Sequence, residues 1–289
     1  MNIAVPFKQV DVFTTSFFKG NPVAVINFMD SEEEVPSTLL QSIANWTNLS
    51  ETTFLFKPSD PKNDYRLRIF TPNEELPFAG HPTIGSCRAF LEFTGRKDAS
   101  QINQECKLGV VRISVTNEKI AFEAVKADID AIPEALVHGL EKCISTTFKT
   151  TPKVLHVGPE WVVGLVEDSQ TCFNLNPDFS LLGDMSGKFG ITGLVIAGKK
   201  PDSSGYEMRA FAPSQGVNED PVCGSGCLAF VRYLQDLYQT SSTTTFDITQ
   251  GGRLQREGKL SATIEHGKDK ISYHVGGQAL TIINGMINI

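Results

Sequence analysis

The stretch Arg68-Ile-Phe-Thr-Pro72, followed by Gly80-His-Pro-Thr-Ile-Gly-Ser-Cys87-Arg-Ala-Phe90, decides the fold of this 289-residue chain. The same order returns half a chain length later as Arg209-Ala-Phe-Ala-Pro213, followed by Asp220-Pro-Val-Cys-Gly-Ser-Gly-Cys227-Leu-Ala-Phe230. An internal repeat of this length indicates two copies of one domain. Each copy contains a strand, a Phe-x-Pro turn, a variable loop, a polar residue before proline, and small residues that lead into a helix.

The segments around the repeat are mostly short strands. Apolar or alternating runs bounded by turn residues predict strands at 52–56, 65–70, 120–122, 161–166, 193–197, 206–211 and 271–275. Helices are predicted over 37–46, 82–93 and 225–238, the last two buried because apolar residues surround their first turns. Without regular strand–helix–strand alternation, this pattern favours an α+β fold over a doubly wound α/β fold.

Capping residues mark the ends of two predicted helices. Ser37 is a plausible N-cap for the helix over 37–46, whose apolar face contains Trp46, and Asn48 should end it. Gly95 should end the helix over 82–93.

Composition excludes several kinds of protein. Hydrophobic residues make up 40% of the chain, and the formal net charge is −7, which argues against a nucleic-acid partner. Residues 1–12 alternate like a strand and do not resemble a signal peptide, and no window approaches the ~20 apolar residues of a membrane helix. Six dispersed cysteines fit free thiols in a reducing compartment. We expect a soluble, cytoplasmic protein with a small-molecule partner and no membrane association.

The two copies suggest an anion-binding arrangement. In each copy a polar residue, His81 or Asp220, is predicted to precede a helix N-terminus, where unpaired amides and the helix dipole favour a bound anion. Gly85 and the turn Gly224-Ser-Gly226 would let backbone amides approach a ligand closely. The alternative is that these small residues only permit tight turns.

His81, Asp220 and Glu51 are the candidate catalytic residues. A neutral His81 at a helix start could exchange protons near neutral pH, although a structural histidine fits the same pattern. Asp220 before Pro221 could equally be an ordinary N-cap. Glu51 comes directly before the predicted strand 52–56, where burial would raise its pKa, although the pattern also fits a solvent-facing strand edge.

Metal and nucleotide sites have little support. Cys223 and Cys227 lack metal-site spacing, and Glu74, Glu75 and His81 lack the spacing of a metal-binding helix. No glycine-rich nucleotide loop is visible. We therefore expect no cofactor and no metal.

Four motifs in order carry a family resemblance, and they are Gly20-Asn-Pro-Val-Ala-Val25, Asn48-Leu-Ser-Glu-Thr-Thr-Phe54, Gly80-His-Pro-Thr-Ile-Gly85 and Glu219-Asp-Pro-Val-Cys-Gly-Ser225. The chain resembles the PhzF-like isomerases of the phenazine-biosynthesis type, and within them the fungal Yhi9-type branch. The resemblance implies two pseudo-symmetric, diaminopimelate-epimerase-like domains, each a curved, mostly antiparallel sheet around a central helix. It places 1–126 with the C-terminal strand at about 277–289 in one half and 127–276 in the other.

The resemblance also implies an activity and a set of site residues. It implies a cofactor-independent isomerase that moves a proton on a small carboxylated substrate resembling dihydro-hydroxyanthranilate, in a cleft between the halves. Glu51 would be the acid/base, assisted by His81 and Asp220, and the substrate would be bound by Asn21, Gly80, Gly224 and Ser225. A homodimer is also implied.

Three points remain open in the sequence. Cys223 replaces the threonine common in the family, and a reactive thiol there would shift the chemistry towards an amino-acid epimerase or racemase. Besides the isomerase and the epimerase or racemase, a binding protein without turnover is also possible. The loops 73–79 and 214–219, one from each copy, are expected to determine specificity.

Overall fold

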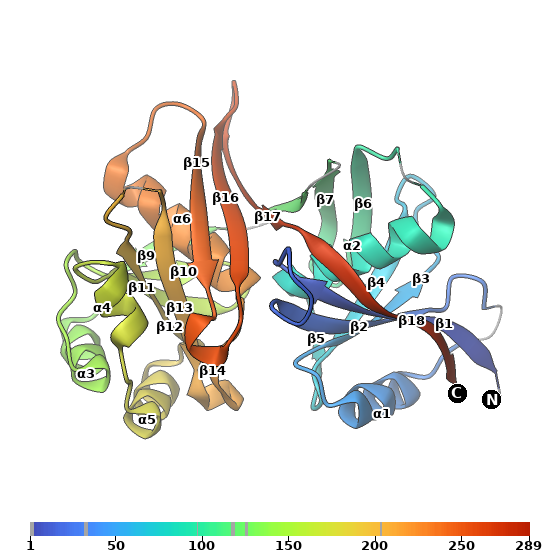
Figure 1. Ribbon diagram of the computed structural model, residues 1–289, viewed down its shortest axis with the longest axis horizontal. Coiled ribbons are helices and arrows are strands. Elements are labelled where there is room, and N and C mark those ends of the chain that lie inside the picture. The colour runs from blue at the N-terminus through green and yellow to red at the C-terminus, as the bar shows by residue number, and fades with distance from the viewer. Residues whose placement is uncertain (1–2, 32–33, 97, 117–118, 125–126, 203) are drawn as a thin grey trace. The chain divides into compact units, whose positions relative to one another are not determined.

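The computed structural model describes residues 3–31, 34–96, 98–116, 119–124, 127–202 and 204–289. Contacts divide the chain into two compact units (Figure 1), one of Met1–Val125 with Gly276–Ile289 and one of Lys126–Val275. Both units combine helices with mostly antiparallel strands, so the predicted α+β class is confirmed.

Among the described residues, the first unit has the following strands: β1 (Ala4–Val12), β2 (Asn21–Asn27), β3 (Thr52–Phe56), β4 (Tyr65–Phe70), β5 (Glu75–Leu76), β6 (Gln101–Cys106), β7 (Gly109–Val115), β8 (Ile120–Glu123) and β18 (Ala279–Asn288). The pairs β2–β3 and β4–β6 are parallel. The pairs β18–β1, β1–β2, β3–β4, β4–β5, β6–β7 and β7–β8 are antiparallel.

The second unit repeats this pairing. Its strands are β9 (Asp128–Ala131), β10 (Lys153–His156), β11 (Glu160–Leu165), β12 (Gly193–Lys199), β13 (Tyr206–Ala212), β14 (Val217–Asp220), β15 (Thr244–Gln250) and β16 (Gly258–His266), and β17 (Ile271–Gly277) contains the boundary between the units. Here β11–β12 and β13–β15 are parallel, and β9–β10, β10–β11, β12–β13, β13–β14 and β15–β16 are antiparallel. The strand sequence β1–β7 therefore has the same pairing types as β10–β16, as expected of a duplicated domain.

Each unit has one long, buried helix against its sheet. They are α2 (Gly80–Thr94) and α6 (Gly224–Tyr238), and most residues of their first three turns are buried. Equivalent aromatic pairs anchor them, because the rings of Tyr65 and Phe90 are 4.7 Å apart and those of Tyr206 and Phe230 are 5.0 Å apart. Both helices were predicted as buried, and the structure confirms this.

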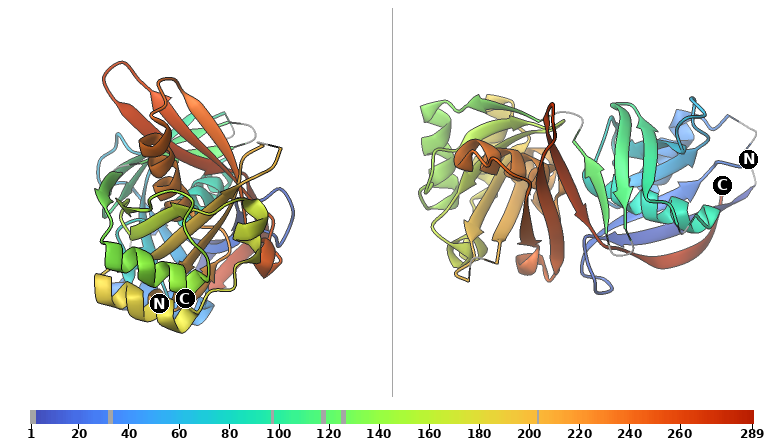
Figure 2. Two further views of the ribbon diagram at one scale, coloured as in Figure 1. Left: turned by 90° about the vertical axis from the view of Figure 1, so that its left-hand side faces the viewer. Right: turned by 90° about the horizontal axis from the view of Figure 1, so that it is seen from above.

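The opposite face of each sheet packs against surface helices. In the first unit α1 (Ser37–Thr47) contributes Leu40 and Ile43 to a core with Ile26 and Phe54. In the second unit α3 (Glu134–Ile144), α4 (Ser169–Asn174) and α5 (Phe179–Phe189) cover the face that contains Leu194 and Ile196. Figure 2 shows α3 and α5 side by side. These three helices were not predicted.

Helix ends agree only in part with the sequence-based expectations. Asn48 and Gly95 end α1 and α2 in the left-handed conformation, as predicted. Ser37 is wrong as an N-cap, because Pro36 holds that position and the Ser37 hydroxyl accepts a hydrogen bond from Arg68 Nη2 instead. Trp46 was placed on the apolar face, but 79% of it is exposed, because it lies in the last turn beyond the core.

The two ends of the described chain meet in the first unit. Ile3 and Ile289 exchange backbone hydrogen bonds of 2.9 Å, and the ends lie together in both views of Figure 2. Within the described ranges, no helix combines the length and apolarity needed to span a bilayer.

Candidate active site

Glu51 lies immediately before β3, and its surroundings exclude most of the solvent. Only 15% of its side chain is exposed. Burial raises the pKa of Glu51 to about 7, although the Ser50 side chain, by hydrogen bonding, acts in the opposite direction. The alternative of a solvent-facing strand edge is wrong. A carboxyl group with this pKa is present in both protonation states near neutral pH, which suits a proton acceptor and donor.

His81 is the partner of Glu51 within the first unit. Its Nε2 lies 3.2 Å from Glu51 Oε2, and only 5% of its side chain is exposed. On the other side of the ring, Asn21 Nδ2 lies 3.3 Å from His81 Nδ1. Because the Asn21 amide nitrogen is a donor, Nδ1 accepts and the neutral ring carries its proton on Nε2, which faces Glu51.

The position of His81 in its helix differs from the prediction. It is the second residue of α2 and does not precede the helix, because α2 begins at Gly80 with Ala79 as N-cap. Relative to the repeat, α2 starts about one turn earlier than α6. The two copies are therefore unequal at the residues that matter most for chemistry.

A chain of buried hydrogen bonds fixes the start of α2. Tyr65 donates to Gln104, whose Nε2 donates to the Thr83 hydroxyl at 3.1 Å, and Thr83 in turn donates to the Ala79 carbonyl at 2.9 Å. These three side chains are fully buried. One turn further along, the hydroxyls of Ser86 and Thr53 are 2.8 Å apart. Because buried polar groups require their partners, this network fixes the first turns of α2, which carry His81.

Asn21 is positioned by the loop that precedes it. The Asp11 carboxylate accepts hydrogen bonds from the amides of Lys19 and Gly20, at 2.9 and 3.1 Å. A Cβ on Gly20 would lie 2.2 Å from the Val12 carbonyl oxygen, so only glycine fits there. The requirement for Gly20 in the Gly-Asn-Pro motif is therefore steric.

Gly85 has a different role from the one expected. A Cβ at this residue would lie 2.3 Å from Val23 Cγ1 and 3.0 Å from Val12 Cγ2. Gly85 thus lets α2 pack closely on β1 and β2, and the expectation of a close approach to a ligand is wrong for this residue. Gly80, the first residue of α2, remains the glycine next to His81.

In the second unit Asp220 ends β14 and is not the N-cap of α6. Its carboxylate accepts from the Val222 amide at 3.0 Å, and its carbonyl accepts from Gln250 Nε2 at 2.9 Å. Gln250 Oε1 also accepts from the Cys223 amide at 3.0 Å. The segment that joins Asp220 to α6 is therefore fixed at both ends, and sequence reasoning missed the part played by Gln250.

The N-cap of α6 is Cys223. Its Sγ accepts from the Gly226 amide at 3.3 Å, and the first-turn amides of Gly224 and Ser225 have no partner within the part of the chain that the structure describes. Burial, followed by the nearby Asp220 charge, raises the pKa of Cys223 well above its ordinary value. Cys223 is therefore a neutral capping thiol, which does not support thiolate chemistry.

Ser225 lies in the first turn of α6 and contacts Trp161. The indole Nε1 donates to the Ser225 hydroxyl at 3.2 Å. The Ser225 hydroxyl also lies 3.6 Å from Cys223 Sγ, and either group of this pair can be the donor. Trp161 is a further site residue that the sequence did not indicate.

Matching ion pairs lie shortly before His81 and Asp220 in the sequence. Arg68 binds Glu75 through Nε and Nη2, each at 2.8 Å, and Arg209 binds Glu219 in the same way at 2.9 and 2.7 Å. These pairs fix the loops 73–79 and 214–219 at one point each. Because Glu75 is bound to Arg68, it is not available as the metal ligand considered above.

The structure thus groups the predicted site residues into two sets. Asn21, Glu51, Gly80 and His81 belong to the first unit, and Asp220, Gly224 and Ser225 belong to the second. Among the residues placed by the structure, no cluster of three or more His, Cys, Asp or Glu side chains could hold a metal ion.

Comparisons with known proteins agree on one family. The profile described as phenazine biosynthesis-like protein (PhzC-PhzF) matches residues 10–285. Antisense-enhancing sequence 1 of Schizosaccharomyces pombe is 39% identical, over 96% of this chain and 97% of its own length. The trans-2,3-dihydro-3-hydroxyanthranilate isomerase of Pseudomonas chlororaphis is 30% identical, with coverage of 96% and 97%.

Solved structures show the same fold. A PhzF-family phenazine biosynthesis protein of Bacillus anthracis aligns with a TM-score of 0.84 and 19% identity, over 99% of this chain and 100% of that one. A hydroxyproline epimerase of Agrobacterium vitis aligns with a TM-score of 0.66 and 11% identity, over 100% and 94%. The predicted epimerase-like fold is thereby confirmed.

Proposed function

Because the chain belongs to the phenazine biosynthesis-like PhzC-PhzF family, we propose that it is an isomerase that moves a proton between two carbons of a small carboxylated substrate. Several relatives carry the name of such an isomerase, acting on trans-2,3-dihydro-3-hydroxyanthranilate. The observation that carries the proposal is the buried pair of Glu51 and His81, in which Glu51 has a pKa of about 7.

In the proposed mechanism, ionised Glu51 removes a proton from an activated C–H bond of the substrate. The C–H electron pair moves into the conjugated system, and the protonated Glu51 then returns the proton to a different carbon. No atom is gained or lost overall. Desolvation makes Glu51 a stronger base than an exposed carboxylate, which is what proton abstraction from carbon requires.

His81 would act beside Glu51 as a hydrogen-bond donor. With Asn21 next to Nδ1, the neutral ring carries its proton on Nε2, which lies 3.2 Å from Glu51 Oε2. From there it can stabilise negative charge that develops on the substrate as the proton leaves. Asn21 would set the tautomer and would not touch the reacting atoms.

Residues of the second unit would bind the substrate carboxylate. The amides of Gly224 and Ser225, which have no partner among the described residues, are donors at a helix N-terminus, where an anion is favoured, and the Ser225 hydroxyl lies in the same turn. Asp220, three residues before the N-cap of α6, would assist the proton transfer. That these groups act on the same substrate molecule as Glu51, in a cleft between the halves, follows from the family resemblance and is part of the proposal.

The two alternatives have less support. A two-thiol epimerase or racemase needs reactive cysteines, whereas five of the six thiols are buried and Cys106 is partly buried. A binding protein without turnover has no need of a buried carboxyl group whose pKa lies near 7.

The test is proton exchange from solvent. The protein is incubated with small carboxylated cyclic dienes, including trans-2,3-dihydro-3-hydroxyanthranilate, in D2O, and deuterium incorporation and isomerisation are measured by NMR. Glu51→Gln should lose both, while Glu105→Gln, a carboxylate of the same unit outside the site, should keep both. If the wild-type protein moves no deuterium and no double bond, the proposal fails.

A further inference from the structure

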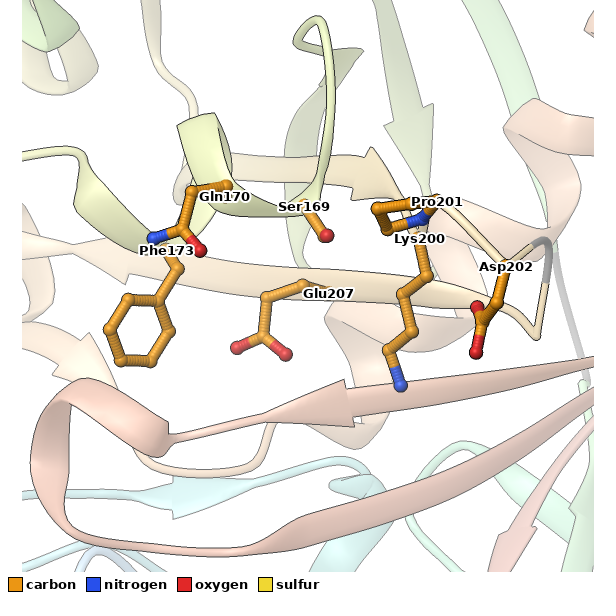
Figure 3. Close-up of a pocket in the computed structure, with 7 residues that line it drawn as sticks. All are labelled: Ser169, Gln170, Phe173, Lys200, Pro201, Asp202 and Glu207. Carbon is orange, nitrogen blue, oxygen red and sulfur yellow. The ribbon is translucent and has the colours of Figure 1, made fainter.

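A cavity of about 440 Å³, widely open to the surface, lies within the second unit, apart from all the residues discussed above (Figure 3). Its wall is α4, its floor is β13, and its far end is the turn after β12. The lining residues are Ser169, Gln170, Phe173, Lys200, Pro201, Asp202 and Glu207. This volume is in the range of small-molecule sites.

The cavity is built into the fold. Asp168 caps α4 by accepting from the Thr171 amide at 2.7 Å, and a Cβ on Gly198 would lie 1.9 Å from the Asp168 carbonyl oxygen. Helix α4 can therefore begin against β12 only because residue 198 is glycine. At the other end of α4, Arg209 Nη1 donates to the Leu175 carbonyl at 2.6 Å. The wall is thus fixed at both ends before any ligand binds.

Two opposite charges face the cavity without neutralising each other in a contact. The Glu207 carboxylate accepts from the Thr249 hydroxyl at 2.5 Å, and no ion pair between it and Lys200 exists among the described residues. In Figure 3 the carboxylate lies between the Phe173 ring and the Lys200 ammonium. Burial raises the pKa of Glu207, with the Thr249 hydrogen bond and the charges of Lys200 and Arg209 acting against it. A cation beside Glu207 would remove this desolvation cost.

The remaining acid at the cavity, Asp202, has a structural role. Its carboxylate accepts from the Ser204 amide at 3.0 Å, within the turn that follows β12. It therefore supports the turn that carries Lys200. Asp202 keeps its charge, which lies near Lys200, so among the lining residues a ligand would meet Lys200 as the cation and Glu207 with Asp202 as the anions.

We infer that this cavity binds a small zwitterion of the amino-acid class. Its ammonium group would pair with Glu207, its carboxylate with Lys200 and the Ser169 hydroxyl, and its apolar part would rest on the Phe173 ring. A ligand with one charge would pair either with Lys200 or with an acid, and would leave the opposite charge of the cavity without a partner. Neither Glu51 nor His81 takes part in this site.

The experiment compares three probes of similar shape with the full chain. L-phenylalanine carries both charges, phenethylamine lacks the carboxylate, and 3-phenylpropionate lacks the ammonium group. Titrations of ¹⁵N-labelled protein should give L-phenylalanine a Kd in the millimolar range or below, with both single-charge probes at least tenfold weaker. Glu207→Gln and Lys200→Gln should each weaken L-phenylalanine at least tenfold, and Glu207→Gln should fold because its amide oxygen can still accept from Thr249.

Two controls separate this site from the proposed function. Lys199→Gln removes a neighbouring exposed charge outside the cavity, and Glu51→Gln removes the proposed catalytic group, so both should bind L-phenylalanine as the wild type does. The inference is overturned if no shifts occur at concentrations up to about 10 mM, if phenethylamine binds as well as L-phenylalanine, or if Glu207→Gln leaves the affinity unchanged.

Discussion

Arg209 and Glu219 form a bidentate ion pair in which only 4% of the Arg209 side chain and 6% of the Glu219 side chain are exposed. Glu219 directly precedes Asp220, and Arg209 Nη1 also binds the carbonyl at the end of α4. The equivalent pair in the first unit, Arg68 with Glu75, has the same geometry but exposures of 21% and 20%. The two units thus contain equivalent ion pairs that differ in how far they are buried.

This difference predicts unequal costs of breaking the two pairs. Glu219→Gln should lower the free energy of unfolding by about 3 kcal/mol, because it leaves Arg209 buried without its counter-charge. Glu75→Gln should cost about 1 kcal/mol, since water reaches Arg68. Urea unfolding of the two variants measures both values. Equal costs would show that burial does not govern these pairs.

Glu51 should make stability depend on pH. Its pKa is about 7 in the folded protein and near its ordinary value in the unfolded chain, so the folded state binds more protons between about pH 4.5 and 7. Burial of Glu51 therefore costs the folded protein least stability below pH 4.5, where the group is protonated in both states. The free energy of unfolding falls as the pH rises towards 7. Glu51→Gln should be more stable than wild type above pH 7, by up to about 3 kcal/mol, and about equal to it below pH 4.5. A stability difference that does not vary with pH would contradict the raised pKa.

Gly85 should tolerate no side chain. Gly85→Ala would place a methyl group 2.3 Å from Val23 Cγ1, so α2 must move off the sheet, at a cost of about 1–3 kcal/mol. Gly187→Ala, on the surface of α5 with open space around the new Cβ, should instead stabilise the protein by roughly 0.5–1 kcal/mol. Thermal unfolding of the pair is the measurement, and a neutral Gly85→Ala would remove the packing explanation.

Cys223 should be replaceable without loss of activity. Cys223→Ser keeps an acceptor for the Gly226 amide and should retain both stability and turnover, whereas Cys223→Ala should lose about 1 kcal/mol of capping. An enzyme that used this thiol as its base would lose activity in both variants. Retained exchange activity in Cys223→Ser therefore separates the isomerase from the epimerase hypothesis.

The parts of the fold that were predictable are those that repeat. Strand 65–70 shares its Tyr, Arg and Phe positions with strand 206–211, and the buried helices share their Cys, Ala and Phe positions, so each copy supports the interpretation of the other. The surface helices α3 and α5 lie outside the two matching stretches, so no second copy supported their prediction. The N-cap of α6 was misplaced because Cys223, a weak acceptor, occupies a position that usually holds Ser, Thr, Asp or Asn.

The sequence could indicate candidate site residues, but it could not predict the contacts between them. The burial of Glu51 and its distance to His81 depend on segments thirty residues apart, and no local pattern encodes that distance. The tautomer of His81 depends on Asn21, sixty residues away in sequence. The sequence does contain an indication of the repeated Arg–Glu pairs, because Arg68 and Arg209 occupy the same position in the two copies.

The measurement that tests the central claim most directly is the pH dependence of deuterium exchange into a carboxylated diene, followed by NMR for the wild type and Glu51→Gln. The wild-type rate should rise with pH through an apparent pKa of about 7 as Glu51 ionises, and Glu51→Gln should be slower by at least about a hundredfold. Exchange by Glu51→Gln at the wild-type rate, or a wild-type rate that does not change between pH 5 and 9, would contradict the assignment of Glu51 as the acid/base.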